Sequence, residues 1–255
     1  MAGLRGWGRA TAEHTWRPLT GKMPTMKLLA IDTTEAACSA ALIIDGSVTA
    51  RYQLAPRQHS ALILPMMQEL LDEAGVALAQ LDGLAFARGP GSFTGVRIAA
   101  GVIQGVAVGV DLPVVPVSSL RALAQRALRE HDARHVLAAF DARMNEVYWL
   151  AAAAEQSGRM RPLGDEQVVA PEQVVVPAGD NWLGVGGGWG SYHPALAARA
   201  GDALAGALPE LTVHAHDVAV LGAAGLAAGQ GVTASLALPV YLRDQVAAKP
   251  KPRGD

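Results

Sequence analysis

A glycine-rich loop stands between two apolar segments of the chain, in the sequence RGPGSFTGVRIAAGVIQG at residues 88–105. Loops of this composition often bind phosphate, so two phosphate-binding motifs can be compared with it. The Walker motif G-x-x-x-x-G-K-[ST] fails because Thr94 stands where its second glycine should follow Gly89. The dinucleotide motif G-x-G-x-x-G fails because Gly89, Gly91 and Gly95 are spaced one residue too widely. The loop therefore matches neither nucleotide-binding motif.

The same loop has the composition of a tight turn between a strand and a helix. Glycine and Pro90 favour such a turn, and the hydroxyl of Ser92 or Thr94 is suited to cap the helix that follows. Arg97 already lies inside this helix. We expect a structural turn, with an anion site as the alternative. The second glycine cluster, LGVGGGWG at 183–190, is also expected to be a turn, with the close approach of a nucleotide base as its alternative.

Two aspartates end apolar segments that resemble strands, Asp32 in LLAID and Asp141 in HVLAAFD. Ligands and metals are often met at strand ends, so Asp32 carries either a ligand-facing carboxylate or one that caps a turn. Asp141 is followed by Arg143 and Glu146. An Asp and an Arg two residues apart on a loop form a local ion pair more often than an active site.

The histidines indicate no metal site. His131 and His135 have the H-x-x-x-H spacing that places two imidazoles on one helix face. The first should end a helix and the second should begin a strand, so a solvated loop is expected. His214 and His216 are predicted to alternate on a strand, and His59 to lie on solvated surface at the start of a long helix. Spacing alone assigns no Ser-His-Asp or Cys-His arrangement.

The properties of the whole chain limit its possible functions. With 255 residues the chain can bury a sizeable core. Its single cysteine, Cys38, lies in an apolar run and is expected to be a core residue, so the chain suits a reducing cytoplasm. The formal net charge of −2 argues against a chain that binds nucleic acid alone, because neutralising phosphates requires a clustered basic face. Although 51% of the residues are hydrophobic, no run offers about 18 uncharged apolar residues, so no membrane span is predicted.

Segments with strand and helix character alternate from Met26 onward, which predicts an α/β fold. The first half begins with three strands, and Asp45-Gly46 is a hairpin turn between the second and the third. Alternating helices and strands follow. The second half repeats this order and is expected to include a helix around 193–204 and strands at 211–215 and 239–242. The repeated order predicts two ribonuclease-H-like lobes.

The expected domain boundaries follow from this order. Residues 26–118 and 119–244 are predicted to form the two lobes. Residues 1–25 lack a secretory apolar run and resemble a disordered leader or an over-long start, since Met26 opens MKLLAIDTT. Residues 245–255 are rich in proline and charge and are expected to be a disordered tail.

Two predicted helices are more apolar than packing against one sheet requires. Apolar side chains cover more than half the circumference of the helix that starts at His59. In the helix after the glycine-rich loop, Gly101, Gly105 and Gly109 recur at four-residue steps, although each costs about 1 kcal/mol relative to alanine. We expect a protein interface here, with internal packing as the alternative. The predicted interface residues are His59, Leu62, Ile63, Met66, Met67, Leu70, Gly101 and Gly105.

The segments LLAIDTT, GPGSFTGVRI, DARMNEVY and PVYLRD together resemble the TsaB (YeaZ) family of tRNA threonylcarbamoyladenosine biosynthesis subunits. The resemblance runs from Met26 to about Asp244. Its specific part is the pairing of GPGSFTGVRI with DARMNEVY, because sugar kinases and actin-like ATPases also carry LLAIDTT-like hairpins. It implies an actin-like ATPase fold of two ribonuclease-H-like lobes. The family-motif residues are Asp32, Gly89, Pro90, Gly91, Ser92, Thr94, Gly95, Arg97, Asp141, Arg143 and Glu146.

The resemblance also implies a non-catalytic role in the cytoplasm. In this family's complex, TsaD carries a metal-binding histidine pair and transfers the threonylcarbamoyl group to adenosine 37 of tRNAs that read codons beginning with A. Here only His59 stands in the corresponding region. TsaB-type chains dock onto TsaD through their first two helices, and the ATPase TsaE joins that pair. ATP and metal then belong to the partner subunits, tRNA binds only through the complex, and the chain alone has no cofactor and can form a homodimer.

Two other functions remain open from the residues. An actin-like small-molecule kinase would need a catalytic Asp in the second lobe, with nucleotide bound at Asp32 and the glycines of 186–188. A protease is suggested only by the historical placement of the family among glycoprotease homologues, and the chain shows no nucleophile-base pair.

Overall fold

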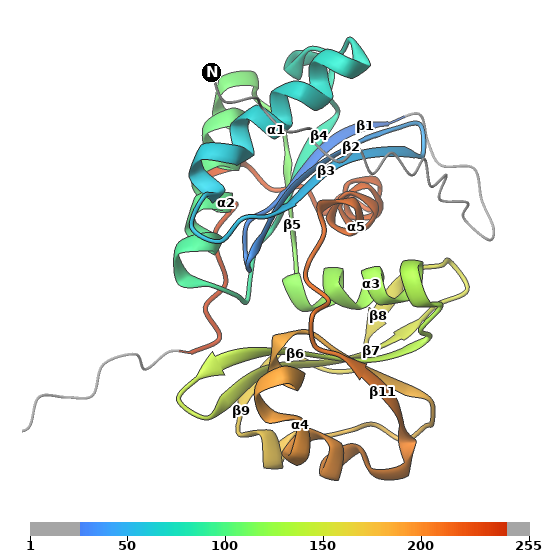
Figure 1. The fold of residues 1–255 in the computed structure, drawn as a ribbon. Helices are drawn as coiled ribbons and strands as arrows, with labels where there is room; N and C mark the ends of the chain where they lie inside the picture. Colours follow the sequence, from blue (N-terminus) through green and yellow to red (C-terminus); the bar gives the residue numbers. More distant parts are fainter. Residues whose placement is uncertain (1–25, 244–255) are drawn as a thin grey trace, which may run out of the picture.

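The computed structural model describes residues 26–243 (Figure 1). The leader predicted for 1–25 and the tail predicted for 245–255 lie outside the described residues. In chain order the strands and helices are β1 (Lys27–Asp32), β2 (Ala37–Ile44), β3 (Ser47–Leu54), α1 (His59–Ala74), η1 (Leu78–Gln80), β4 (Gly83–Ala87), α2 (Phe93–Val110), β5 (Val114–Val117), α3 (Ser119–His131), β6 (His135–Arg143), β7 (Glu146–Ala154), β8 (Met160–Pro162), β9 (Gln167–Val169), η2 (Pro171–Gln173), β10 (Trp182–Val185), α4 (Gly187–Ala200), η3 (Gly201–Ala203), β11 (Leu204–Leu208), α5 (Ala215–Ala227) and η4 (Ala234–Leu236).

Two sheets with the same topology form the framework. The first has the order β3-β2-β1-β4-β5 and the second the order β11-β10-β6-β7-β8, with β9 also paired to β7. In each sheet the first two strands along the chain are antiparallel, and the first strand pairs in parallel with a later strand of its lobe, β4 or β10. The same architecture therefore occurs twice, and the prediction of an actin-like fold with two ribonuclease-H-like lobes is confirmed.

Helices α3 and α5 lie between the two sheets. Helix α3 packs on β6, β7 and β8, whereas α5 packs on β1, β2, β4 and β5 (Figure 1). The two helices also contact each other. Helix α5, from the range predicted for the second lobe, thus covers the first sheet. Helices α1 and α2 cover the outer face of the first sheet, and α4 covers that of the second.

Three apolar clusters fill the spaces between these layers. One surrounds α3 and α5 between the sheets, one lies beneath α1 and α2, and one lies beneath α4. Helix α2 is long and apolar enough to cross a membrane by length and composition alone, contrary to the expectation from the sequence. Of its span, 33% is buried inside the protein, and an apolar helix packed on a sheet passes the same test.

Several predicted local signals form as expected. Asp45 and Gly46 both take positive φ values, 50° and 88°, as a two-residue hairpin turn requires. Gly75 ends α1 in the left-handed conformation with φ 62°. The Ser118 side chain caps α3 by accepting from the Arg121 N–H at 3.0 Å.

Other segments differ from the sequence-based prediction. Residues 211–215 form no strand, because the N–H groups of Val213 and Ala215 donate to the side chains of Glu35 and Ser39 instead of to a neighbouring strand. Residues 239–242 also form no strand. Helix α4 begins before the predicted 193–204, the end of the predicted range forms the 3-10 helix η3, and β11, which was not predicted, begins at Leu204.

Candidate functional site

The glycine-rich loop between β4 and α2 packs directly on the turn that follows β1. The Ser92 N–H donates to the Thr34 carbonyl, and the Thr33 hydroxyl donates to the Gly95 carbonyl, both at 2.7 Å. A Cβ on Gly95 would stand 2.0 Å from the Thr33 carbonyl oxygen, and one on Gly91 would stand 2.5 Å from that of Thr34. These glycines therefore let two segments of protein backbone approach each other.

The same loop sets the start of α2. The Ser92 side chain is the N-cap and accepts from the Gly95 N–H at 3.4 Å, while Thr94 is exposed in the first turn. Gly89 has φ 101°, a left-handed value that favours glycine, and the adjacent Pro90 is buried. The geometry supports the turn interpretation, with Ser92 and not Thr94 as the cap.

The carboxyl group of Asp32 is buried beneath this loop. Its Oδ1 accepts from the Thr34 N–H at 3.1 Å and the Thr34 hydroxyl at 2.6 Å. Burial raises the pKa of Asp32 to about 6, against the opposing effect of these hydrogen bonds. Burial also raises the pKa of Glu35 to about 8, and the nearby charge of Asp32 contributes. The Asp32 carboxyl group therefore caps the turn through Oδ1, while its buried Oδ2 has no hydrogen-bond partner among the described residues.

Helix α2 presents a flat apolar face to solvent. Its buried stripe faces the first sheet, and on the opposite side Gly101, Gly105 and Gly109 are exposed. A Cβ on any of the three would meet no atom within 4 Å. Phe93 and Val108 on the same helix are 58% and 74% exposed. The glycines therefore do not serve close packing inside the described part of the chain.

Aromatic and cationic side chains lie at the start of this helix. The Arg97 guanidinium lies over the Phe93 ring, 3.6 Å from its centroid, and its Nε donates to the Tyr241 hydroxyl at 2.9 Å. Tyr241 is 45% exposed. The C-terminal segment thus adds an aromatic ring beside the apolar face of α2.

Comparison with known proteins identifies the family. Residues 51–251 match the family model described as "TsaD: tRNA N6-adenosine threonylcarbamoyltransferase". A protein from Escherichia coli (strain K12), "tRNA threonylcarbamoyladenosine biosynthesis protein TsaB", is 43% identical over 235 residues, which cover 89% of this chain and 99% of the relative. The chain belongs to the TsaB (YeaZ) family.

Two other TsaB-family proteins are similarly close. The Haemophilus influenzae protein of the same name is 48% identical over 178 residues, covering 67% of this chain and 75% of the relative. The solved structure "YeaZ from Pseudomonas aeruginosa" superposes with a TM-score of 0.80 at 48% identity, covering 85% of this chain and all of that one (100%). The sequence similarity and the fold therefore agree over most of the chain.

Most α1 residues predicted to meet a partner are buried inside this TsaB-family chain. Helix α1 packs on β2 and contacts β3 and α2, so its wide apolar surface is largely used within the molecule. Leu62 is half-buried against the same core, and Leu64 is 52% exposed. The prediction that His59 is solvated is also wrong, because only 9% of it is exposed. The buried residues of the predicted interface are His59, Ile63, Met66, Met67 and Leu70.

The second motif of the TsaB family forms the hairpin between β6 and β7. Asp141 accepts from the Arg143 N–H at 2.7 Å and from its guanidinium at 3.2 Å, so the predicted local ion pair is confirmed. Glu146 pairs with Arg243 of the C-terminal segment. The Tyr192 hydroxyl lies 3.4 Å from Asp141. This set ties the hairpin to α4 and to the C-terminal segment.

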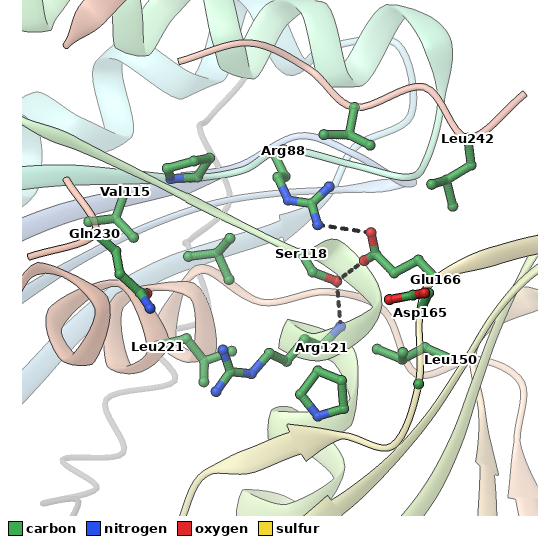
Figure 2. Close-up of a pocket in the computed structure, with 15 residues that line it drawn as sticks. Arg88, Val115, Ser118, Arg121, Leu150, Asp165, Glu166, Leu221, Gln230 and Leu242 are labelled. Carbon is green, nitrogen blue, oxygen red and sulfur yellow. Dashed lines mark hydrogen bonds and ion pairs between the residues drawn. The ribbon is translucent and has the colours of Figure 1, made fainter. Parts of the chain in front are cut away.

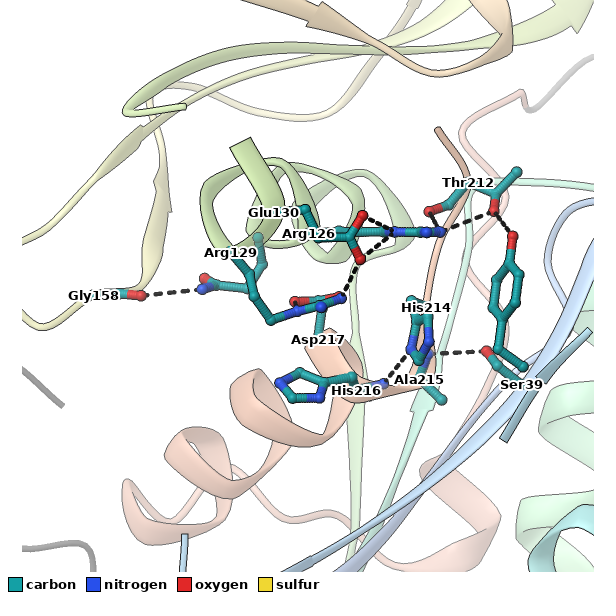
Figure 3. A network of polar contacts seen from close by, with 12 residues as sticks. Ser39, Arg126, Arg129, Glu130, Gly158, Thr212, His214, Ala215, His216 and Asp217 are labelled. Carbon is teal, nitrogen blue, oxygen red and sulfur yellow. Dashed lines mark hydrogen bonds and ion pairs between the residues drawn. The ribbon is translucent and has the colours of Figure 1, made fainter. Parts of the chain in front are cut away.

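Two pairs of histidines lie at the ends of elements in this TsaB-family chain. His214 and His216 do not alternate on a strand: His214 caps α5, and its ring accepts from the His216 N–H at 3.0 Å (Figure 3). The His214 ring stacks on Tyr52 with centroids 4.9 Å apart. His131 ends α3 and His135 begins β6. Within residues 26–243 no group of three or more His, Cys, Asp or Glu side chains could hold a metal ion.

The second glycine cluster makes room for the protein's own atoms. A Cβ on Gly184 would stand 2.4 Å from the Trp189 ring, and one on Gly188 would stand 2.8 Å from Ala139. Gly186 has φ 95° between β10 and α4. The geometry supports the turn interpretation over the approach of a nucleotide base.

Sequence reasoning missed several exposed apolar residues on and beside α1 and α2. Leu64, Phe93, Val108 and Tyr241 were not predicted as interface residues, although each is at least 45% exposed. Phe93 lies within the family motif, and Leu64 lies within an apolar run already noted. Only the packing of α1 and α2 on the sheet decides which members of those runs face solvent.

Proposed function

We propose that this chain is a non-catalytic subunit required for threonylcarbamoyl transfer to adenosine 37 of tRNA. The names of its relatives link the TsaB family to tRNA threonylcarbamoyladenosine biosynthesis. In this proposal the chain acts in the cytoplasm and pairs with the catalytic subunit TsaD, and the ATPase TsaE joins the pair. ATP and metal are held by those partners.

The exposed face of α2 carries this proposal. Its glycines Gly101, Gly105 and Gly109 leave the backbone open to a second helix, while Phe93 and Val108 supply apolar contact. Exposed glycine inside a helix lowers stability, so its repetition on one face suits a close helix-helix seam. A helix of a partner chain that packs here would bury the exposed apolar face of α2.

The closed turn at Asp32 favours a scaffold over a small-molecule kinase. Gly91 and Gly95 of the loop over Asp32 contact Thr34 and Thr33, and the carboxyl group of Asp32 is fully buried. The chain in this proposal binds tRNA only as part of the complex, because its net charge of −2 provides no strong counterion-release contribution.

Co-purification with TsaD tests the proposal. Gly105→Leu should abolish pairing, because a bulky side chain separates two closely packed helices. Ala198→Leu on the exposed surface of α4 is the matched control and should leave pairing intact. Folded Gly105→Leu protein that still pairs with TsaD and still supports threonylcarbamoyl transfer would contradict the assignment of this face.

A further inference from the structure

A cavity of about 480 Å³ lies between the two lobes, on the side of β5 and β8 (Figure 2). Its walls come from the end of β5 and the start of α3, the loop before β9, helix α5 and the C-terminal segment. Val117, Leu150 and Leu221 are buried apolar side chains in these walls, and the partly exposed Leu242 lies at the edge. The volume falls within the range of small-molecule sites.

One cation in this cavity has no anionic partner among the described residues. Arg88 pairs with Glu166 at 2.9 Å, and Glu166 also accepts from the Ser118 hydroxyl. Arg121 is different: its Nε donates to the Met160 carbonyl at 2.7 Å, and no carboxylate in residues 26–243 lies within ion-pair distance.

The surroundings of Arg121 disfavour an unpaired charge. Burial lowers the pKa of Arg121, while the more distant Glu155 favours its charged form. Arg121 is partly buried, and an anion that accepts the remaining hydrogen bonds of such a guanidinium stabilises its charge. In Figure 2 its guanidinium lies beside Leu221, on the opposite side of the cavity from Asp165 and Glu166.

We propose that the cavity binds a small monocarboxylate with an apolar body, its carboxylate pairing with the Arg121 guanidinium. The body lies against Leu150 and Leu221, which form the apolar wall near this arginine. The cavity is lined by two arginines, Arg88 and Arg121, and by two carboxylates, Asp165 and Glu166, of which Glu166 is already paired with Arg88. One ligand carboxylate would pair with Arg121, whereas a polyphosphate would bring several negative charges toward Asp165 and Glu166.

Titration calorimetry on the full chain tests this site with N-acetyl-leucine as the probe. Acetate carries the carboxylate without the apolar body, and N-acetyl-leucinamide carries the body without the charge. N-acetyl-leucine should bind once per chain and more tightly than either by about tenfold or more, since a charge-assisted hydrogen bond contributes more than a neutral one. ATP should neither bind here nor displace the probe.

Three variants locate the binding. Arg121→Gln should weaken binding of the probe by about tenfold or more. Leu242→Trp should also weaken binding, because the larger side chain fills the cavity from its edge. Arg161→Gln removes an arginine that is 58% exposed outside the cavity and should change nothing. If Arg121→Gln does not fold, Leu242→Trp decides. The proposal is overturned if wild type binds no carboxylate, if N-acetyl-leucinamide binds equally well, or if folded Leu242→Trp binds the probe unchanged.

Discussion

Arg129 of α3 and Asp217 of α5 form a two-pronged ion pair between the helices that lie between the sheets (Figure 3). Its two contacts measure 3.0 and 2.7 Å, and the Asp217 side chain is 1% exposed. Burial raises the pKa of Asp217, and the Arg129 guanidinium counteracts this effect. Since α3 packs on the second sheet and α5 on the first, this pair links the two lobes at their centre.

Removing the carboxylate of this pair should be strongly destabilising. Asp217→Asn removes the buried partner of Arg129 and leaves it only the more exposed Glu130, which we expect to lower the free energy of unfolding by about 3 kcal/mol. Urea denaturation measures the loss. Glu73→Gln on the surface, where the carboxylate is 57% exposed and pairs with Arg51, should change stability by less than about 1 kcal/mol. Equal effects at the two sites would show that the buried pair contributes little.

Two glycines of α2 should respond oppositely to alanine. A Cβ on Gly95 meets the Thr33 carbonyl oxygen at 2.0 Å, so Gly95→Ala should destabilise the chain by about 1–3 kcal/mol. Gly105 has no atom within 4 Å of a Cβ, so Gly105→Ala should stabilise the isolated chain by about 0.5–1 kcal/mol. Thermal and urea unfolding of both variants give the comparison. Stabilisation by Gly95→Ala would refute the close packing of the loop on the turn.

Two apolar residues of α1 should separate folding from partner binding. Met66 is 4% exposed, so Met66→Asp should prevent folding or cost at least about 3 kcal/mol by burying a charge. Leu64 is 52% exposed, and Leu64→Asp should fold normally while weakening pairing with TsaD. Circular dichroism and co-purification distinguish these effects. A stable Met66→Asp chain that fails only in pairing would show that this face of α1 is free.

Stability should fall as pH rises through the titration of Asp32. The pKa of its carboxyl group is about 6 in the folded chain, against an ordinary value of 3.8, so the folded chain retains this proton more strongly than the unfolded chain. The associated stability is fully present below about pH 4 and is lost as pH rises through about 6, with a total of about 3 kcal/mol.

Urea denaturation across this pH range, in wild type and Asp32→Asn, measures the effect. Asparagine cannot ionise, so the variant should lose this part of the pH dependence. The pKa of Glu35 is about 8, so its effect on stability extends to higher pH than that of Asp32. Glu35→Gln should therefore remove a slope that Asp32→Asn leaves. Parallel pH curves for wild type and Asp32→Asn would indicate that Asp32 has no raised pKa.

Local sequence signals predicted most of the individual elements. The pair Asp45-Gly46 indicated the hairpin, Gly75 the end of α1, and Ser92 a possible cap for α2, because each acts through its own backbone or that of a near neighbour. The repeated order of strands and helices was sufficient for two lobes of one topology. These features depend on interactions short in sequence.

The sequence of 211–215 alternates in the manner of a strand, but the segment forms no strand. The N–H groups of Val213 and Ala215 donate to the side chains of Glu35 and Ser39 in the first lobe. These partners lie 178 and 176 residues earlier in the chain. No local pattern reports such partners. The alanine- and glycine-rich β11 was missed for the converse reason, since LAGAL has weak strand propensity and is held by its pairing with β10.

The sequence by itself determined the two-lobed fold and the chemical character of the motifs, because periodicity, turn residues and glycine spacing act locally. Only the tertiary structure decided which surfaces remain available. Both Met66 and Leu64 belong to one apolar run, yet the sheet covers the first and leaves the second exposed. The carboxyl group of Asp32 became a buried cap because a loop distant in the sequence closes over it. Exposure and pKa depend on what packs against a side chain, and packing partners distant in sequence are brought together only by the fold.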